Sequence, residues 1–320
     1  MLMGSSRFIL MQVAEENETL VTEFVLIGCS LWIKQRMVLV IFLAVAYSAA
    51  LIGNGIIIMV VISEPKLHNP MYFFLCNLSV LDFCIITTTV PQSIANCLED
   101  RPVMSLQRCY IQMVTSTMLT ITEYLLLMFM AYDRYVAIST PLHYMMIMNW
   151  TVCILLVTVA WAGALIIVLV PLFVMKIKLC GNYIVNHIAC ELKAFIKLWC
   201  IDWRLYQVAF YLVSLLVLVF PICFILFSYV RILVAILRMN SEGSRMKAFS
   251  TCGSHLAVVT MYYGTSIVSY SLPQTKETHL SDLIISLFYY ALTPVFNPLV
   301  YTLRNKVILE ALKTLFGQKR

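Results

Sequence analysis

Charged residues are scarce in this sequence of 320 residues. Asp, Glu, Lys and Arg make up 12% of it and hydrophobic residues 62%, whereas charged residues make up about a quarter of a typical soluble domain. The mean hydropathy of +0.90 points the same way. We therefore exclude a soluble globular domain and expect a chain that lies mostly in lipid, where one spanning helix needs roughly 20 mostly apolar residues.

Three further absences narrow the function. The basic residues are dispersed, so the net charge of +6 does not indicate nucleic-acid binding. No nucleophile, ordered base or metal-ligand spacing accompanies the acidic residues of the apolar runs, so we do not expect an enzyme. No cysteine follows Cys252, which leaves the C-terminal segment without a site for a lipid anchor.

Seven apolar runs predict an all-α membrane protein, a bundle of seven transmembrane helices. The runs lie near residues 37–62, 70–94, 108–132, 152–175, 205–230, 249–272 and 283–303. Ser, Thr and Tyr dilute the sixth and seventh runs, which suggests faces turned towards protein or water. The predicted organisation is an extracellular tail (1–36), a seven-transmembrane domain (37–303) and a cytoplasmic tail (304–320). Apolar residues recur at helical spacing after Arg304, so this last segment should form a short amphipathic helix on the membrane surface.

The orientation of the bundle follows from cysteines rather than from basic residues, which divide evenly between the two sides. Five cysteines lie at or beyond span ends on the side of the N-terminus: Cys97, Cys109, Cys180, Cys190 and Cys200. Disulfides persist outside the cell, so we expect an extracellular N-terminus. Asn17 is then the usable glycosylation site, because Asn77 lies within a span and Asn149 in an inner loop.

Five sequence motifs occur together between the first inner loop and the end of the seventh span. They are LHNPMYFFLCNLSVLD from Leu67, MAYDRYVAISTPLHY from Met130, SYVRIL from Ser228, KAFSTCGSHL from Lys247 and PVFNPLVYTLRN from Pro294. Over about residues 20–317 the chain resembles vertebrate odorant receptors, within the rhodopsin-like G-protein-coupled receptors. The resemblance implies a plasma-membrane receptor that binds an odorant and activates a stimulatory, olfactory-type heterotrimeric G protein to raise cyclic AMP.

The resemblance assigns activation to residues near the inner ends of the helices. These are Asp133, Arg134, Tyr135, Tyr229, Asn297, Pro298 and Tyr301. In such receptors the arginine is restrained at rest and contacts the G protein once the inner helix ends separate. The alternative is that Arg134 only anchors its helix by extending its charge to water, and that the two tyrosines Tyr229 and Tyr301 are interfacial aromatics.

Two acidic residues, Asp82 and Glu123, lie within the second and third spans, where an unpartnered carboxylate is expensive. With Asn54 and Asn297 they match a polar cluster that can hold a sodium ion in related receptors. A protonated, hydrogen-bonded network without a metal is the alternative. No other cofactor is expected. The resemblance also implies disulfides between Cys109 and Cys190 and between Cys180 and Cys200.

The predicted ligand is small, neutral and mostly apolar. Ser116 stands where amine receptors have an aspartate, and Ala291 stands where opsins have the lysine that binds retinal. The residues predicted to line the pocket are Ser116, Thr117, Thr120, Tyr263, Ser266, Ile267 and Tyr270. They offer apolar walls and a few hydroxyls, unless those hydroxyls only bond between helices.

Two other functions remain open from the sequence. A receptor for a non-volatile metabolite outside the nose would use the same scaffold. A transporter or channel would show repeats, paired interrupted helices or charged pore rings, and none is found in the sequence.

Overall fold

The computed structural model describes residues 23–28, 36–174, 184–185, 187–192, 208, 212–239, 241–271, 279–304 and 306–315. Within this part of the chain, six helical segments are long and apolar enough to cross a membrane. Four of them are single helices, α2 (Arg36–Ser63), α3 (Pro70–Leu98), α4 (Leu106–Ser139) and α6 (Trp150–Val174). The others run over Leu212–Leu237, which ends in α9 (Phe220–Leu237), and over Leu283–Thr302, which joins the end of α11 (His279–Leu287) to α12 (Thr293–Arg304).

The remaining crossing is α10 (Glu242–Ser271), a helix of 30 residues. It is long enough to cross the bilayer but is not among the six helices that are apolar enough. Its polar and aromatic residues face the neighbouring helices, as the diluted sixth run predicts, because Tyr262, Tyr263 and His255 are all buried. The predicted bundle of seven helices is therefore confirmed.

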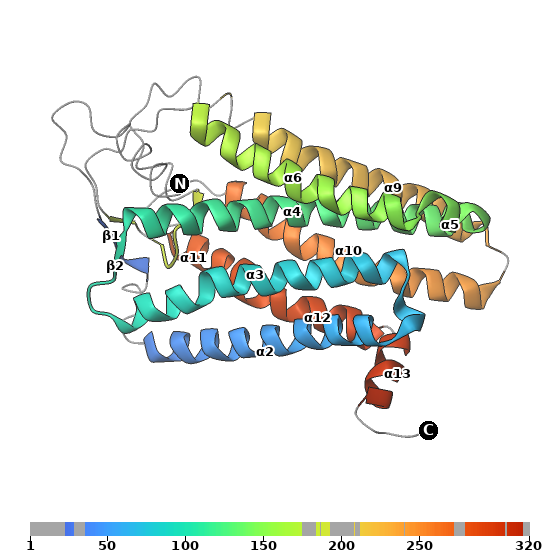
Figure 1. Ribbon diagram of the computed structural model, residues 1–320, viewed down its shortest axis with the longest axis horizontal. Helices are drawn as coiled ribbons and strands as arrows, with labels where there is room; N and C mark the ends of the chain where they lie inside the picture. The colour runs from blue at the N-terminus through green and yellow to red at the C-terminus, as the bar shows by residue number, and fades with distance from the viewer. Residues whose placement is uncertain are drawn as a thin grey trace.

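The helices run along the long axis of the molecule, and α4 lies in the middle of the bundle (Figure 1). It contacts α3, α6, α9 and α10, while α2 packs against α3 and α12. The main apolar core lies around α4, where Leu78, Leu127 and Val258 are fully buried. At one end, Arg36 ties α2 to α3 by donating hydrogen bonds to the Cys97 carbonyl and, at 3.0 Å, to Asp100.

Two wide π-helical turns precede prolines in the bundle. They are Leu215–Val219, before Pro221, and Phe288–Leu292, before Pro294. A proline ring clashes with the carbonyl four residues earlier, and in both cases that residue, Val217 or Tyr290, lies inside the π turn. The wider turn accommodates the ring without ending the helix.

A small three-stranded sheet covers the end of the bundle that carries the disulfide. Its strands are β1 (Glu23–Leu26), β2 (Val103–Ser105) and β3 (Ile184–Val185), in the order β2-β1-β3. β1 pairs antiparallel with β2 and parallel with β3. The sequence did not predict this sheet. Part of the segment 1–36 is therefore not a simple tail but a strand that packs on the bundle, with Phe24 and Leu26 buried.

The opposite end carries the short elements that follow α2, α4 and α12 (Figure 1). After α2 comes the 3-10 turn Pro65–Leu67, and after α4 come the turn Pro141–His143 and the single-turn helix α5 (Tyr144–Ile147). The predicted C-terminal helix is α13 (Lys306–Leu315). Its apolar face is buried, since Ile308 and Ala311 pack against α2 and the start of α3.

Candidate functional site

Near the C-terminal end of α4, Arg134 is held in place by a neighbouring carboxylate. Arg134 Nε donates to Asp133 Oδ2 at 3.0 Å, and the guanidinium makes a second hydrogen bond to the same oxygen. Asp133 is buried, and its other oxygen accepts a hydrogen bond of 2.6 Å from the Tyr144 hydroxyl. Burial beside Asp133 raises the pKa of Tyr144 well above its ordinary value, so this hydroxyl keeps its proton and donates at neutral pH. The Arg134 side chain is therefore restrained by its hydrogen bonds to Asp133.

Tyr229 lies on α9 beside this cluster and faces α10. Its hydroxyl is 2.7 Å from His255 Nδ1, and the two rings are stacked at 5.7 Å. Tyr135 packs into a small apolar cluster with Ile232 and Cys252 from the same two helices. Two of the predicted activation residues, Tyr135 and Tyr229, therefore meet at the contact of α4, α9 and α10.

The predicted polar cluster forms halfway along the bundle. Asn297 Nδ2 donates to both oxygens of Asp82, at 3.1 and 2.8 Å, and Tyr262 donates to Asp82 Oδ1 at 2.8 Å. The Tyr289 hydroxyl donates to Glu123 Oε2 at 3.2 Å. Both acidic side chains are fully buried, so these hydrogen bonds replace the solvation that each carboxyl loses.

The same cluster fits a small cation. Three buried oxygens, Asn54 Oδ1, Glu123 Oε1 and Asn297 Oδ1, accept no hydrogen bond from any described residue. Carboxylate and amide oxygens are the donors that hard cations prefer. Asn54 is held in place because its amide nitrogen donates to the carbonyls of Ala50 and Pro294. Tyr301 also belongs here, with a buried hydroxyl that has no partner among the described residues.

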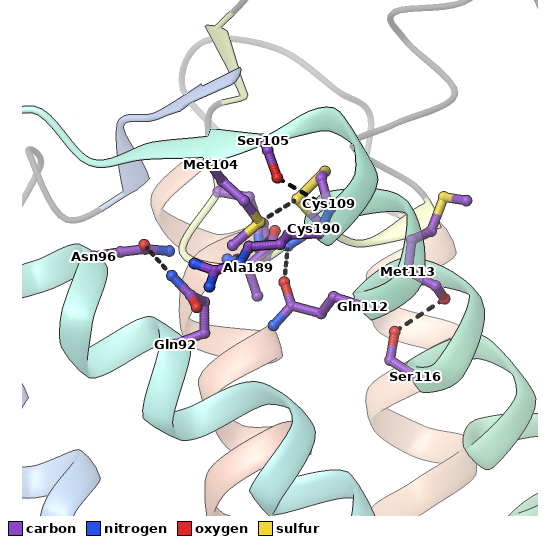
Figure 2. Close-up of a disulfide and its surroundings, with 12 residues drawn as sticks. Gln92, Asn96, Met104, Ser105, Cys109, Gln112, Met113, Ser116, Ala189 and Cys190 are labelled. Atoms are coloured by element: carbon purple, nitrogen blue, oxygen red, sulfur yellow. Dashed lines mark hydrogen bonds between the residues drawn. A yellow bond between two sulfur atoms is a disulfide. The ribbon is translucent and has the colours of Figure 1, made fainter. Parts of the chain in front are cut away.

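A disulfide closes the other end of the bundle (Figure 2). It joins Cys109, in the first turn of α4, to Cys190, with 5.3 Å between the Cα atoms. Gln112, one turn along α4, accepts a hydrogen bond from the Cys190 amide at 3.0 Å and donates to the Thr88 carbonyl at 3.0 Å. Asn96 Nδ2 donates to the Ile188 carbonyl at 3.2 Å. Residues 187–190 are therefore fixed to both α3 and α4.

Several predicted residues of this end lie outside the described part of the chain. They are Asn17, Cys180 and Cys200. Cys97, at the end of α3, is also disulfide-bonded. Because the described cysteines other than Cys109 and Cys190 are free thiols, its partner lies outside the described residues.

The three predicted ligand hydroxyls of α4 are occupied within their own helix. Ser116 and Thr117 donate to the Met113 carbonyl at 3.1 and 2.7 Å, and Thr120 donates to the Ser116 carbonyl at 2.8 Å. The Thr120 oxygen also lies 3.2 Å from the Tyr289 hydroxyl, whose one proton serves either Thr120 or Glu123. Such bonds leave the oxygen lone pairs, rather than the protons, for a ligand.

The predicted residues of α10 do not all face the interior. Tyr263 is buried and donates to the Tyr124 carbonyl at 3.2 Å, and Ser266 is hydrogen-bonded to the Tyr124 hydroxyl. Ile267 is 44% exposed and shares its helix face with exposed Leu256 and Thr260, so the structure corrects its assignment to the pocket. The side chain of Tyr270 lies outside the described part of the structure.

Four residues with central contacts were missed by the sequence analysis: Tyr144, His255, Tyr262 and Tyr289. Tyr144 ends the motif MAYDRYVAISTPLHY, and the polar dilution of the last two spans was the signal for the other three. Neither signal identified a partner, because the partners lie on α3, α4 and α9.

Known proteins resemble this chain over nearly its whole length. Residues 43–319 match the sequence profile of the family described as olfactory receptor. Human olfactory receptor 13H1 is 42% identical over 301 residues, which cover 94% of this chain and 98% of that protein. Human olfactory receptor 2A12 is 40% identical, over 96% of this chain and 99% of its own. Mouse olfactory receptor 2B6 is 41% identical, over 93% and 96%. The chain therefore belongs to the olfactory receptor family of multi-pass membrane proteins, which are G-protein-coupled receptors and not enzymes.

Proposed function

We propose that this receptor binds a small, neutral, mostly apolar odorant and activates a stimulatory, olfactory-type G protein, which raises cyclic AMP. The observation that supports this coupling is the restraint of Arg134. Its guanidinium donates hydrogen bonds to Asp133, which also accepts a hydrogen bond from Tyr144. Leu142 lies beside this site on the same inner end and is 93% exposed. A partner that docks there would cover this apolar side chain and gain the freed arginine as a hydrogen-bond donor.

The coupling is tested with Arg134→Ala. This variant should reach the cell surface but lose the agonist-evoked rise in cyclic AMP. Arg231→Ala is a matched control, because Arg231 is an exposed arginine of α9. An undiminished response of Arg134→Ala at equal surface expression would show that the coupling does not depend on this residue.

The ligand is proposed to lie between the third, fifth and sixth spans. Support comes from Ser116, a neutral residue that is buried on α4, and from the hydroxyl-bearing residues Tyr263 and Ser266 on α10. The predicted lining contains no Lys or Arg that would hold a carboxylate. A panel of neutral, cationic and anionic odorants with a cyclic-AMP readout tests this class, and a response to permanently charged amines alone would contradict it.

Tyr270 is proposed to donate a hydrogen bond to an oxygen of the ligand. Tyr270→Phe should then weaken the potency of oxygenated agonists about 2-fold to 13-fold, the equivalent of roughly 0.5 to 1.5 kcal/mol. Tyr263→Phe is the comparison, because its hydroxyl is already bonded to Tyr124 and its loss should affect every agonist alike. Unchanged potency for all oxygenated agonists in Tyr270→Phe would refute the contact.

The polar cluster is proposed to hold a sodium ion, with Asp82 and Glu123 as its acidic residues. Its support is the set of buried oxygens without partners around them. Replacing sodium with choline should change agonist potency in the wild type and not in Asp82→Asn. An equal response of both receptors to the exchange would favour a protonated network without metal.

The receptor is proposed to lie in the plasma membrane with an extracellular tail (1–36), a transmembrane domain (37–303) and a cytoplasmic tail (304–320). Apolar side chains exposed along the helices, such as Ile52 and Phe227, suit contact with lipid. An N-terminal epitope tag should be accessible to antibody on intact cells. Staining only after permeabilisation would reverse the orientation.

A further inference from the structure

A groove of about 490 Å³ lies between α2, α12 and α13, at the end of the bundle that carries Arg134. Its walls are apolar, and they include Ala49 and Gly53 from α2, Pro298 and Leu299 from α12, and Leu312 from α13. Lys313 lines it as well and is its charged residue. Figure 1 shows α13 beside the end of α12 and the end of α2, and its residues Leu309 and Leu312 line the groove.

The groove exists because α2 has small residues where it meets α12. A Cβ atom on Gly53 would lie 2.8 Å from Pro298 Cγ, so only glycine permits this approach of the two helices. Ala49, one turn earlier, has a side chain too small to fill the space beside the contact. The helices therefore touch at Gly53 and leave a hollow next to it.

The hollow faces the surroundings of the bundle rather than its core. Ala49 is exposed, and Leu299 is 45% exposed. Both lie within helices that are long and apolar enough to cross a membrane, so the medium that they meet is lipid. An apolar site of this volume falls within the roughly 300–1,000 Å³ of typical small-ligand sites.

Lys313 is held at the rim of the hollow by the fold of α13. Ile308 and Ala311 bury the opposite face of this helix against α2 and α3, and Lys313 lies exposed in its last turn. A lysine at the membrane surface attracts anionic lipids, by an amount that corresponds to about fivefold in affinity. A sterol carries no charge for this lysine, and a second copy of the chain would place two lysines on one contact.

We propose that this groove is a binding site for an anionic phospholipid of the inner leaflet. One acyl chain lies in the hollow along Gly53 and Pro298, and the phosphate pairs with Lys313. The bound lipid touches the turn of α12 that also carries Asn297, which donates to Asp82. The packing of α2, α12 and α13 therefore depends on the lipid composition of the membrane.

The test uses the full-length receptor, purified in phosphatidylcholine nanodiscs, and a phosphatidylserine probe with a photoreactive diazirine in its acyl chain. Cross-linked peptides should come mainly from α2, α12 and α13. Unlabelled phosphatidylserine should compete about fivefold better than phosphatidylcholine. Water-soluble glycerophosphoserine should not compete, because the acyl chain is part of the recognition.

Two pairs of variants separate the site from general membrane contact. Lys313→Gln should abolish the preference for phosphatidylserine, whereas Lys66→Gln, which removes an exposed lysine at the same end, should keep it. Ala49→Trp should fill the groove and reduce labelling by all lipids, whereas Ala44→Trp, at an exposed position of the same helix outside the groove, should not. All four replace exposed residues, and equal melting temperatures would verify their folding.

Three outcomes would overturn the proposal. They are labelling spread evenly over the lipid-facing helices, an unchanged lipid preference in Lys313→Gln, and displacement of the probe by cholesterol but not by phosphatidylserine. Cross-linking of two receptors through this face in place of lipid would assign it to a second copy. None of these readouts depends on the ligand or on the G protein.

Discussion

Tyrosine hydroxyls join the helices of this receptor at the scale of single residues. Tyr262 joins α10 to α3, Tyr263 joins α10 to α4, and Tyr289 joins the seventh span to α4. A phenol combines a large apolar ring with one donor, so it packs in the core and still satisfies a buried oxygen. The excess of tyrosine in the last two spans has this structural use.

Tyr262→Phe should lower the free energy of unfolding by about 1 to 3 kcal/mol, since it removes a donor from buried Asp82. The melting temperature of the purified receptor measures this loss. Tyr47→Phe is the control, because Tyr47 is a half-buried tyrosine whose hydroxyl makes no hydrogen bond with the described residues. Equal melting temperatures for the two variants would mean that the Tyr262 contact contributes nothing.

Tyr144 should make stability depend on pH in the alkaline range. Burial and the neighbouring Asp133 raise its pKa in the folded protein, whereas a tyrosine of the unfolded chain has a pKa of about 10. Its contribution is therefore complete below about pH 10 and is lost as the pH rises above that value, because only the unfolded state then releases the proton.

This dependence is tested by melting curves measured from about pH 8 to about pH 11, the range around the pKa of tyrosine. The wild type should lose more stability over this range than Tyr144→Phe does. Parallel curves would indicate that Tyr144 releases its proton equally well in both states.

The residues of the site were predictable by type more readily than by contact. The motifs contain Asp133 and Arg134, which are hydrogen-bonded to each other in the structure. They also contain Asp82 and Asn297, which form a second hydrogen-bonded pair. Tyr144 is the last residue of the motif MAYDRYVAISTPLHY, but its contact with Asp133 depends on how α5 folds back beneath α4. Ile267 was misplaced because a one-residue step on a helix turns a side chain by about 100°, and hydropathy does not distinguish a lipid-facing residue from an inward one.

At the scale of elements, the predicted spans agree with the helices but are shorter than the helices at the end of the bundle that carries Arg134. The third run, 108–132, compares with α4 over Leu106–Ser139, and the sixth, 249–272, compares with α10 from Glu242. Hydropathy marks the part of a helix inside lipid, whereas these helices continue beyond it with polar residues at the end that carries Arg134. Helix caps, such as Ser105 before α4, set the true ends.

Asn149 shows why a sequon need not be a glycosylation site. Its side-chain oxygen accepts a hydrogen bond of 3.0 Å from the Val152 amide, so it caps the start of α6. Asn149→Ala should cost about 0.5 to 2 kcal/mol of stability and leave the glycan unchanged. Asn17→Gln should instead abolish the shift seen on glycosidase digestion, and a persistent shift in that variant would place the glycan elsewhere.

The C-terminal helix α13 should depend on its buried face. Ile308 is fully buried against α2 and α3, so Ile308→Ala should lower stability by about 2 to 5 kcal/mol. Lys313→Gln changes an exposed residue of the same helix and should have almost no effect. The melting temperatures of both receptors decide this, and equal values would show that α13 is not docked in solution.

At the scale of the whole molecule, the sequence predicted the bundle but not the sheet that covers the end with the Cys109–Cys190 disulfide. The three strands have four residues or fewer, and β1 pairs with strands that lie about 80 and about 160 residues later in the sequence. Short strands lack the alternation that makes a pattern recognisable. Long-range pairing is visible only when the helices bring the loops together.

The disulfide pairing at the end of the bundle with the sheet can be narrowed by counting the cysteines whose state the structure gives. Of the 11 cysteines, two form the Cys109–Cys190 bond, five are free thiols, and Cys97 is bonded outside the described residues. The remaining cysteines are Cys29, Cys180 and Cys200. If Cys180 and Cys200 pair with each other, as the resemblance implies, then Cys97 pairs with Cys29.

The described neighbours of Cys29 and Cys97 support this pairing. Gly28 donates to the His187 carbonyl at 3.3 Å, and Asn96 donates to the next carbonyl, that of Ile188, at 3.2 Å. Each of the two cysteines directly follows one of these donors in the sequence. Peptide mapping of the surface receptor without reduction should therefore recover Cys29–Cys97, Cys109–Cys190 and Cys180–Cys200. A peptide that joins Cys97 to Cys180 or to Cys200 would overturn both this pairing and the bridge within the loop, whereas Cys29→Ser should leave a free thiol at Cys97 and the other two bonds intact.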